Sequence, residues 1–258
     1  MNRFVIEMEG ITLHKAKNIL LDHINLCFSE GEFAGIIGPN GAGKTTLLNV
    51  IAGFERFTGR LSLFGQDQTW HRDRNITIRI GYVPQVLEID RSFPILAYEV
   101  VLTGCLGRTG LFRLPEKKEK ERSEEVMEML RIKDMAKKPF GRLSGGEQQK
   151  VILARAIIQE PHILLLDEPA SNLDMAVQKE FMDLISDIHK KKGMTILLVT
   201  HDFNLLPASL RRGILINKGK IVFDGDIRTA TSGEVLSALF KYNLETFERN
   251  GKRFVSYD

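Results

Sequence analysis

The chain lacks the features that would place it in a membrane or in an oxidising compartment. Among its 258 residues are only two cysteines and one tryptophan, and no apolar run approaches the roughly 18 residues that a membrane helix needs. Residues 1–7 lack the long apolar core of a signal peptide. Cys27 and Cys105 lie far apart and outside any metal-spaced cluster, so we interpret both as reduced structural thiols. We therefore expect a cytoplasmic protein.

An excess of one charge is also missing. The 36 basic and 33 acidic residues give a formal net charge of +3, which is too small to indicate the concentrated basic face of a nucleic-acid-binding protein. We therefore expect no nucleic-acid partner. The sequence has no internal repeat, low-complexity tract or Pro/Ser-rich linker, and its length suits one large α/β domain or a domain with an inserted lobe.

What the sequence does contain is a glycine-rich loop with the P-loop pattern. Residues 33–37 read as a short buried strand before this loop, and an amphipathic helix follows it and is stopped by Gly53. Such a loop forms a nest of backbone N–H groups at the positive end of a helix, and its glycines let phosphate oxygens approach. We expect Lys44 to reach the β- and γ-phosphates of ATP and the Thr45 hydroxyl to ligate Mg²⁺. The residues of the predicted ATP site are Gly38, Pro39, Asn40, Gly41, Ala42, Gly43, Lys44, Thr45 and Thr46.

A pair of carboxylates follows a second buried strand. The apolar run 163–166 ends in Asp167 and Glu168, and open α/β sheets bind ligands at the carboxyl ends of their strands. We expect Asp167 to hold Mg²⁺ through water and Glu168 to be the base that polarises the attacking water. The alternative is a simple turn or helix cap, but the P-loop upstream favours a catalytic pair.

Two further polar residues stand at the ends of strand-like segments. Gln85 closes the segment 81–85, where it could touch Mg²⁺ or the attacking water, and His201 follows the apolar run 196–200. Taken alone, either residue would be interpreted as an exposed polar side chain or as a buried one whose hydrogen bonds are satisfied in the core. Because the strand ends of one sheet converge on the nucleotide, we expect catalytic roles for both.

The texture changes between these motifs. Residues 1 to about 85 alternate short strands and turns around the P-loop helix, whereas residues from about 86 to 140 read mainly as helices, including a charged helix over 115–131 with a solvated face. A second glycine motif follows at 143–147, Leu-Ser-Gly-Gly-Glu. Ser144 is a candidate N-cap whose hydroxyl, with the N–H groups of Gly145 and Gly146, would face an anion; the alternative is a capped helix start alone.

Taken in order, these motifs resemble the ATP-binding-cassette (ABC) ATPase family over about residues 5–226. The resemblance implies an α/β fold with a P-loop NTPase core, whose mixed sheet carries an N-terminal antiparallel β subdomain, and an inserted helical subdomain. Residues 1–85 would form the β subdomain and the P-loop part of the core. Residues 86–142 would form the helical subdomain, with the signature 143–147 at its end, and residues 148–258 the remaining core with a short C-terminal extension. By position, 38–46 become Walker A, Gln85 the Q-loop, 163–168 Walker B, 171–174 the D-loop and His201 the switch histidine.

The resemblance also implies a dimer. In this family the signature reads the γ-phosphate of an ATP that the other subunit holds, so the chain is expected to form a head-to-tail homodimer that ATP closes and hydrolysis reopens. Because Glu168 is present, we expect both composite sites to hydrolyse ATP. The residues assigned to the partner's ATP are Ser144, Gly145, Gly146, Glu147 and Asp174.

Two positions depart from the family pattern. The family usually stacks adenine on an aromatic residue before Walker A, but residues 11–17 contain no Tyr, Phe or Trp. His14 is the best substitute and Lys15 the next. Lys150 stands where the family commonly has Arg, which keeps the charge but loses the forked donor geometry.

The function implied is the ATP-hydrolysing subunit of a membrane transporter. The sequence resembles most the ATPases that import iron-siderophores, haem or cobalamin, and next the ATPases of zinc and manganese importers. Such a subunit would lie on the cytoplasmic face of the membrane through its permease, and would serve a solute-binding protein indirectly. Residues 93–99 would dock the permease or, equally, form subdomain core. The alternatives are an exporter ATPase, a non-transport ABC protein and an unrelated P-loop kinase; a kinase would lack the motif at 143–147.

Overall fold

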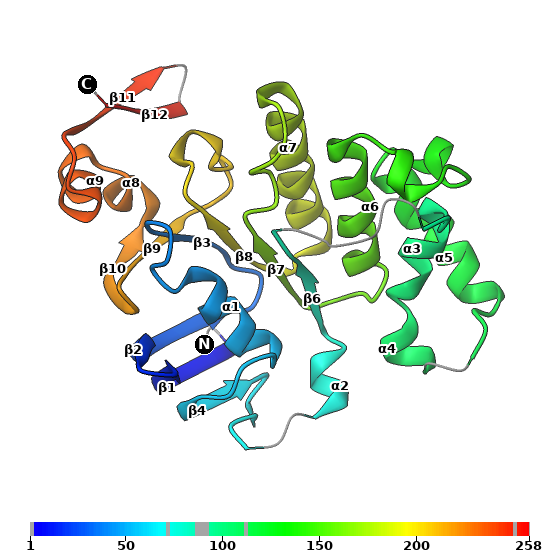
Figure 1. The fold of residues 1–258 in the computed structure, drawn as a ribbon, viewed down its shortest axis with the longest axis horizontal. Helices are drawn as coiled ribbons and strands as arrows, with labels where there is room; N and C mark the ends of the chain where they lie inside the picture. Colours follow the sequence, from blue (N-terminus) through cyan, green and yellow to red (C-terminus); the bar gives the residue numbers. More distant parts are fainter. Residues whose placement is uncertain (1–2, 71–72, 86–92, 111–112, 250–251, 258) are drawn as a thin grey trace. The chain divides into compact units, whose positions relative to one another are not determined.

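The computed structural model describes residues 3–70, 73–85, 93–110, 113–249 and 252–257. The chain divides into two compact units, one formed by residues 1–77 with 186–258 and the other by residues 78–185. In Figure 1 the colours follow the chain from blue to red, and labels mark most helices and strands. The boundaries expected at residues 85, 142 and 148 stay a prediction.

The first unit contains an antiparallel sheet in the order β2-β1-β4-β5. It is built from β1 (Phe4–Lys15), β2 (Asn18–Ser29), β4 (Thr58–Leu63) and β5 (Gln66–Asp67). Side chains of β1 turn inward at intervals of about two, including the fully buried Ile6 and Ile11, and register shifts mark irregularities along the strand. This is the half-buried pattern of a sheet with one solvated face.

The same unit holds the strands that carry the P-loop. β3 (Phe33–Ile37) pairs in parallel with β8 (Thr195–Thr200) on one side and with β9 (Arg212–Asn217) on the other. β10 (Lys220–Asp226) adds to β9 in antiparallel fashion. Every residue of β3 and β8 is buried, as expected of central parallel strands covered on both faces. Parallel strands and an antiparallel β subdomain are thus both present, as predicted.

The helices of this unit follow its strands along the chain. They are α1 (Lys44–Ala52), α2 (Arg74–Thr77), α8 (Ile227–Ala230) and α9 (Gly233–Phe240), with a 3₁₀ turn η3 (Phe203–Leu205). Helix α8 contacts β9 and β10. The chain ends in a hairpin of β11 (Leu244–Arg249) and β12 (Lys252–Tyr257). Cys27 is half-buried and Cys105, in the other unit, is buried; both are free thiols, and burial raises the pKa of Cys105.

The second unit is mainly helical. It contains α3 (Ala97–Thr103), α4 (Leu106–Thr109), α5 (Lys117–Met129), α6 (Gly145–Ile157) and the short turns η1 (Lys133–Met135) and η2 (Phe140–Arg142). Its strands β6 (Ile80–Val83) and β7 (Ile163–Asp167) pair in parallel. Helix α7 (Met175–Lys192) begins in this unit and ends in the first.

The helices predicted between residues 86 and 142 are confirmed where the structure describes that stretch, since residues 86–92 and 111–112 lie outside the described ranges. The charged helix predicted over 115–131 runs from Lys117 to Met129. Its Lys117–Glu121 ion pair, at 3.5 Å, lies on the solvated face as expected. Within the described ranges, no helix combines the length and apolar character needed to cross a bilayer.

Candidate functional site

The glycine-rich loop joins the end of β3 to the start of α1, as the sequence predicted. Gly43 caps α1 with φ of 106°, a left-handed conformation that L side chains rarely adopt, and Gly53 ends the helix in the same region. At Gly38 an added Cβ would lie 2.2 Å from the carbonyl oxygen of Ile216. The loop therefore needs glycine for its turn at one position and for close packing against β9 at the other.

Lys44 lies inside this loop. Its Nζ donates to the carbonyl oxygens of Gly38 at 2.8 Å and Pro39 at 3.1 Å, and the residue is only 5% exposed. The first turn of α1 carries the basic Lys44 and two neutral threonines, Thr45 and Thr46, so the positive end of the helix dipole is reinforced. A helix start with a buried cation combines positive charge with backbone N–H groups, and both bind phosphate.

The rest of the loop is held from the side. The N–H of Gly219, between β9 and β10, donates to the carbonyl of Ala42 at 2.9 Å. Ala42 is buried, whereas Asn40, Gly41 and Thr45 are exposed. The loop thus presents its polar side outward while its buried side is fixed by hydrogen bonds within the first unit.

The carboxylate pair lies at the end of β7 in the second unit. Asp167, 2% exposed, accepts a hydrogen bond from the hydroxyl of Tyr82 on β6 at 3.3 Å. Burial, together with the negative charge of Asp167, raises the pKa of Tyr82, so this phenol stays a donor at neutral pH. Tyr82 is not among the predicted site residues, although its place on a strand shortly before the predicted Gln85 was a signal for it.

Glu168 and Gln85 contact one another although they lie 83 positions apart in the sequence. The Gln85 Nε2 donates to the Glu168 Oε2 at 3.1 Å, so the structure brings together two residues that the sequence assigned to the same chemistry. Glu168 is 8% exposed and adopts φ of 45°. A left-handed conformation at a residue other than glycine costs of order 1–3 kcal/mol and is frequent at active sites.

The second glycine motif starts helix α6, with Ser144 as its N-cap as predicted. The Ser144 Oγ accepts from the N–H of Glu147 at 3.3 Å, and the Ser144 N–H donates to the Glu147 carboxylate at 2.7 Å. This reciprocal pair is a capping box. The N–H bond from Ser144 is the main cause that lowers the pKa of Glu147. The Ser-x-x-Glu spacing signals such a box, but sequence reasoning had not assigned this structural contact to Glu147.

The two glycines of the motif have different surroundings. A Cβ at Gly146 would lie 2.5 Å from Val177 on α7, so this glycine permits close packing of α6 against α7. Gly145 is exposed, with Leu173 3.7 Å from its ideal Cβ. Asp174 is also exposed, and its Oδ1 accepts from the N–H of Val177 at the start of α7.

Lys150 extends from α6 toward α7. Its Nζ lies 2.6 Å from the Glu180 carboxylate and lowers the pKa of that group. Lys150, which stands where the family commonly has Arg, therefore forms an ion pair within the second unit.

His201 follows β8 directly, as predicted, and is exposed. The turn beyond it is fixed by short contacts: the N–H of Asp202 donates to Thr200 Oγ1 at 3.0 Å, and the N–H of Asn204 donates to the Asp202 carboxylate at 2.8 Å. The predicted histidine thus sits between a buried strand and a hydrogen-bonded 3₁₀ turn.

The two candidates for the adenine contact lie at the end of β1. His14 is exposed and pairs with Ile19 in the register of β1 and β2. The Lys15 Nζ lies 3.3 Å from the Glu55 carboxylate, and its side chain is 69% exposed. The first unit therefore holds the P-loop, His14 and His201, and the second holds Gln85, the carboxylate pair, the capping box and Asp174.

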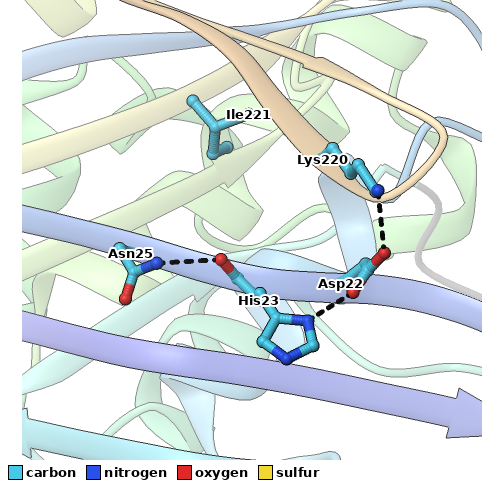
Figure 2. Close-up of a pocket in the computed structure, with 5 residues that line it drawn as sticks. All are labelled: Asp22, His23, Asn25, Lys220 and Ile221. Atoms are coloured by element: carbon cyan, nitrogen blue, oxygen red, sulfur yellow. Dashed lines mark hydrogen bonds and ion pairs between the residues drawn. The ribbon is translucent and has the colours of Figure 1, made fainter.

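A polar pocket of about 440 Å³ lies between β2 and β10 in the first unit. Figure 2 shows the Asp22 carboxylate between His23 Nδ1, at 2.5 Å, and Lys220 Nζ, at 3.1 Å. These two partners lower the pKa of Asp22, the His23 contact most. The pocket residues, completed by Asn25 and Ile221, differ from the predicted site residues.

Comparison with known proteins gives concordant results. A family model described as ABC transporter matches residues 21–171. The zinc uptake system ATP-binding protein ZurA of Listeria monocytogenes is 36% identical over 223 residues, which are 86% of this chain and 85% of the relative. The manganese transport system ATP-binding protein MntB of Bacillus subtilis is 38% identical over 221 residues, 85% of this chain and 86% of the relative.

Solved structures agree with the sequence relatives. A chain of a metal-chelate type ABC transporter in an inward-facing conformation aligns with a TM-score of 0.83 and 26% identity, covering 99% of this chain and 97% of the other. An ATP-binding cassette in a dimeric post-hydrolysis state bound to ADP and Pi aligns with a TM-score of 0.74 and 29% identity, covering 86% and 99%.

Proposed function

The chain belongs to the ABC transporter family, and we propose that it is the ATP-hydrolysing subunit of an importer for metal ions or metal chelates. Relatives named for zinc and manganese transport are 36–38% identical to it over about 85% of its length, which favours these ions as cargo. The metal-chelate type neighbour, with its TM-score of 0.83, supports chelated metal as the second candidate.

The observation that carries this proposal is the presence of two helix starts suited to phosphate in one chain. One is the P-loop at the start of α1, with Lys44 buried inside it. The other is the start of α6, where Ser144 caps the helix. Helix N-termini with free donors bind anions, and a single-site P-loop kinase would need only the first. The second start serves the ATP of a partner subunit in a homodimer.

ATP hydrolysis is assigned to the site residues predicted from the sequence. Glu168 takes a proton from the attacking water as general base, and Gln85, bonded to its carboxylate at 3.1 Å, orients that group. The hydroxyl of Thr45, the carboxylate of Asp167 and the amide oxygen of Gln85 are hard oxygen donors, which is the ligand set that Mg²⁺ prefers. A bound Mg²⁺ would offset negative charge on the phosphates. His201 contacts the γ-phosphate, and His14 or Lys15 contacts adenine.

Each subunit completes its partner's site in this proposal. Ser144, Gly145 and Gly146 donate to the γ-phosphate of the partner's ATP, and Asp174 lies at the same interface. Glu147 supports this arrangement indirectly, since its carboxylate fixes Ser144 through the capping box. The dimeric state of the cassette bound to ADP and Pi supports a dimer of this chain.

Coupling to transport requires a permease. The proposed contact is the segment 93–99, where Phe93 is 59% exposed and Ala97 is fully buried. The exposed ring fits a docking surface and the buried alanine fits subdomain core, so the segment serves both purposes. The permease would hold the chain at the cytoplasmic face of the membrane, and a solute-binding protein would deliver the metal.

The experiment that tests this function measures metal content in a strain from which the gene has been deleted. Cells grown under zinc, manganese or iron limitation are analysed by mass spectrometry, after complementation with the wild-type chain or with Glu168→Gln. We expect the wild type alone to restore accumulation of one metal. Restored metal content with Glu168→Gln would refute ATP-driven import, and a rise in metal content on deletion would indicate export.

A further inference from the structure

The turn that follows His201 is bound to the far end of the chain. The Val255 N–H of β12 donates to Asn204 Oδ1 at 2.9 Å, and Asn204 Nδ2 returns a longer bond of 3.5 Å to the Val255 carbonyl. One side-chain amide therefore pairs with both backbone groups of a single strand residue, 51 positions away. Figure 1 shows this hairpin as the red end of the chain.

The hairpin is itself anchored to α9. The Ser237 Oγ accepts from the N–H of Leu244 at 2.8 Å and donates to its carbonyl at 3.3 Å. Thr246 Oγ1 accepts from the N–H of Gly233 at 3.2 Å, at the start of α9. Along the hairpin, the rings of Phe247 and Phe254 stack at 5.6 Å. The bonds from Ser237 and Gly233 thus attach β11 to α9, and the stacked rings join β11 to β12.

Helix α9 also contacts the turn after His201 directly. Phe203 meets Phe240 edge to face, with ring centroids 5.3 Å apart. Phe203 and Leu206 pack against a buried cluster that includes Ile37 and Leu215. Ile37 is the last residue of β3, so the cluster includes the residue that directly precedes the P-loop. Two kinds of contact thus fix the turn: the apolar packing of Phe203 and Leu206, and the bonds between Asn204 and Val255.

We propose that Asn204 is a positioning residue for His201, and that the C-terminal hairpin supports the switch histidine through it. The inference rests on the proposed function, in which His201 contacts the γ-phosphate. Two residues separate His201 from Asn204, and the Asp202 carboxylate binds the Asn204 N–H. Releasing Asn204 from Val255 frees this turn, and a displacement of about 1 Å at a reacting centre can cost up to about 100-fold in rate.

The test is a double-mutant cycle on ATP hydrolysis by the full-length chain. Asn204→Ala, His201→Ala and the double variant are compared with wild type for kcat, for KM of ATP and for the fraction of chains that bind ATP. We expect Asn204→Ala to lower kcat by about tenfold, within the range for misplaced groups, with KM changed by less than about twofold because the P-loop is untouched. Asn204→Asp keeps the acceptor for the Val255 N–H, so we expect it to retain part of the activity.

A matched control is available in the same unit. Asn25 is exposed and also makes two bonds to backbone groups, although of two different residues: it accepts from the Gly10 N–H at 2.8 Å and donates to the His23 carbonyl at 3.0 Å. Figure 2 shows the second of these. Asn25→Ala should leave kcat unchanged, whereas an equal loss in this variant would mean that any such bond in the first unit matters equally.

The cycle separates positioning from general stability. If Asn204 acts through His201, its replacement has no further effect in the His201→Ala background. An equal loss of kcat in both backgrounds would overturn the inference and leave the proposed function standing, as would wild-type kcat for Asn204→Ala. Wild-type kcat for His201→Ala would remove the proposed role of that histidine, and the inference with it.

Discussion

Glu168→Gln removes a base while changing little else around it. Glutamine has the length of glutamate, and its amide oxygen can still accept the bond that Gln85 Nε2 donates at 3.1 Å. The backbone φ of 45° is equally unfavourable for both residues, so we expect the free energy of unfolding to change by less than about 1 kcal/mol. The loss of a general base lowers turnover by about 10²- to 10⁴-fold. This corresponds to about 2.7–5.4 kcal/mol in activation free energy, at 1.36 kcal/mol per decade.

The assay pairs single-turnover hydrolysis of ATP with a direct measurement of ATP binding. We expect binding to be retained and the rate of phosphate release to fall by at least about 100-fold. Glu121→Gln, which neutralises an exposed carboxylate on α5, is the control and should match wild type. Wild-type turnover by Glu168→Gln would show that the base lies elsewhere, and a loss of ATP binding would show that Glu168 acts in the ground state.

Three further substitutions address other parts of the molecule. Ser144→Arg places a cation at the positive start of α6, so it should spare ATP binding and abolish the ATP-trapped dimer of a Glu168→Gln background in size-exclusion chromatography; a surviving dimer would refute the composite site. His14→Ala should weaken ATP binding by about tenfold in calorimetry, because histidine is a poorer stacking partner than Tyr, Phe or Trp and should contribute near the low end of the about 1–3 kcal/mol that stacking on a base is worth; an unchanged affinity would point to Lys15 or to no stacking. Arg212→Met should lower the free energy of unfolding by about 1–3 kcal/mol, measured in urea, because the guanidinium pairs with Asp224 at 2.5 and 2.6 Å and with Glu32 at 2.9 Å; unchanged stability would mean that water replaces these bonds.

Local signals predicted the elements around each motif well. The strand at 33–37, the helix stop at Gly53 and the Ser144 cap were all readable because each depends on residues only a few positions apart. Buried apolar runs likewise marked β7 and β8, and the polar residues at their ends followed from the strand boundaries. The sequence thus predicted which residues occupy strand ends and helix starts.

Contacts between distant residues were not readable in the same way. The sequence placed Glu168 and Gln85 near the same nucleotide but did not predict the hydrogen bond between them. Nothing in the sequence indicated the left-handed backbone of Glu168. The hydrogen bond from Lys44 Nζ to the Gly38 carbonyl depends on the conformation of the loop, which the P-loop sequence pattern does not specify. The pairing of Asn204 with Val255 of β12, 51 positions away, likewise had no local signal in the sequence.

The capping box at Ser144 has a consequence for which residues this position can accept. A hydroxyl has two lone pairs and one proton, and capping the Glu147 N–H uses a lone pair. The proton remains available for an acceptor beyond the helix, so one oxygen can serve the fold and a phosphate at the same time. Aspartate caps helices equally well, but its carboxylate has no proton to give and would repel a phosphate. Selection for helix stability alone would therefore accept several residues here, whereas selection for both tasks leaves the hydroxyl side chains.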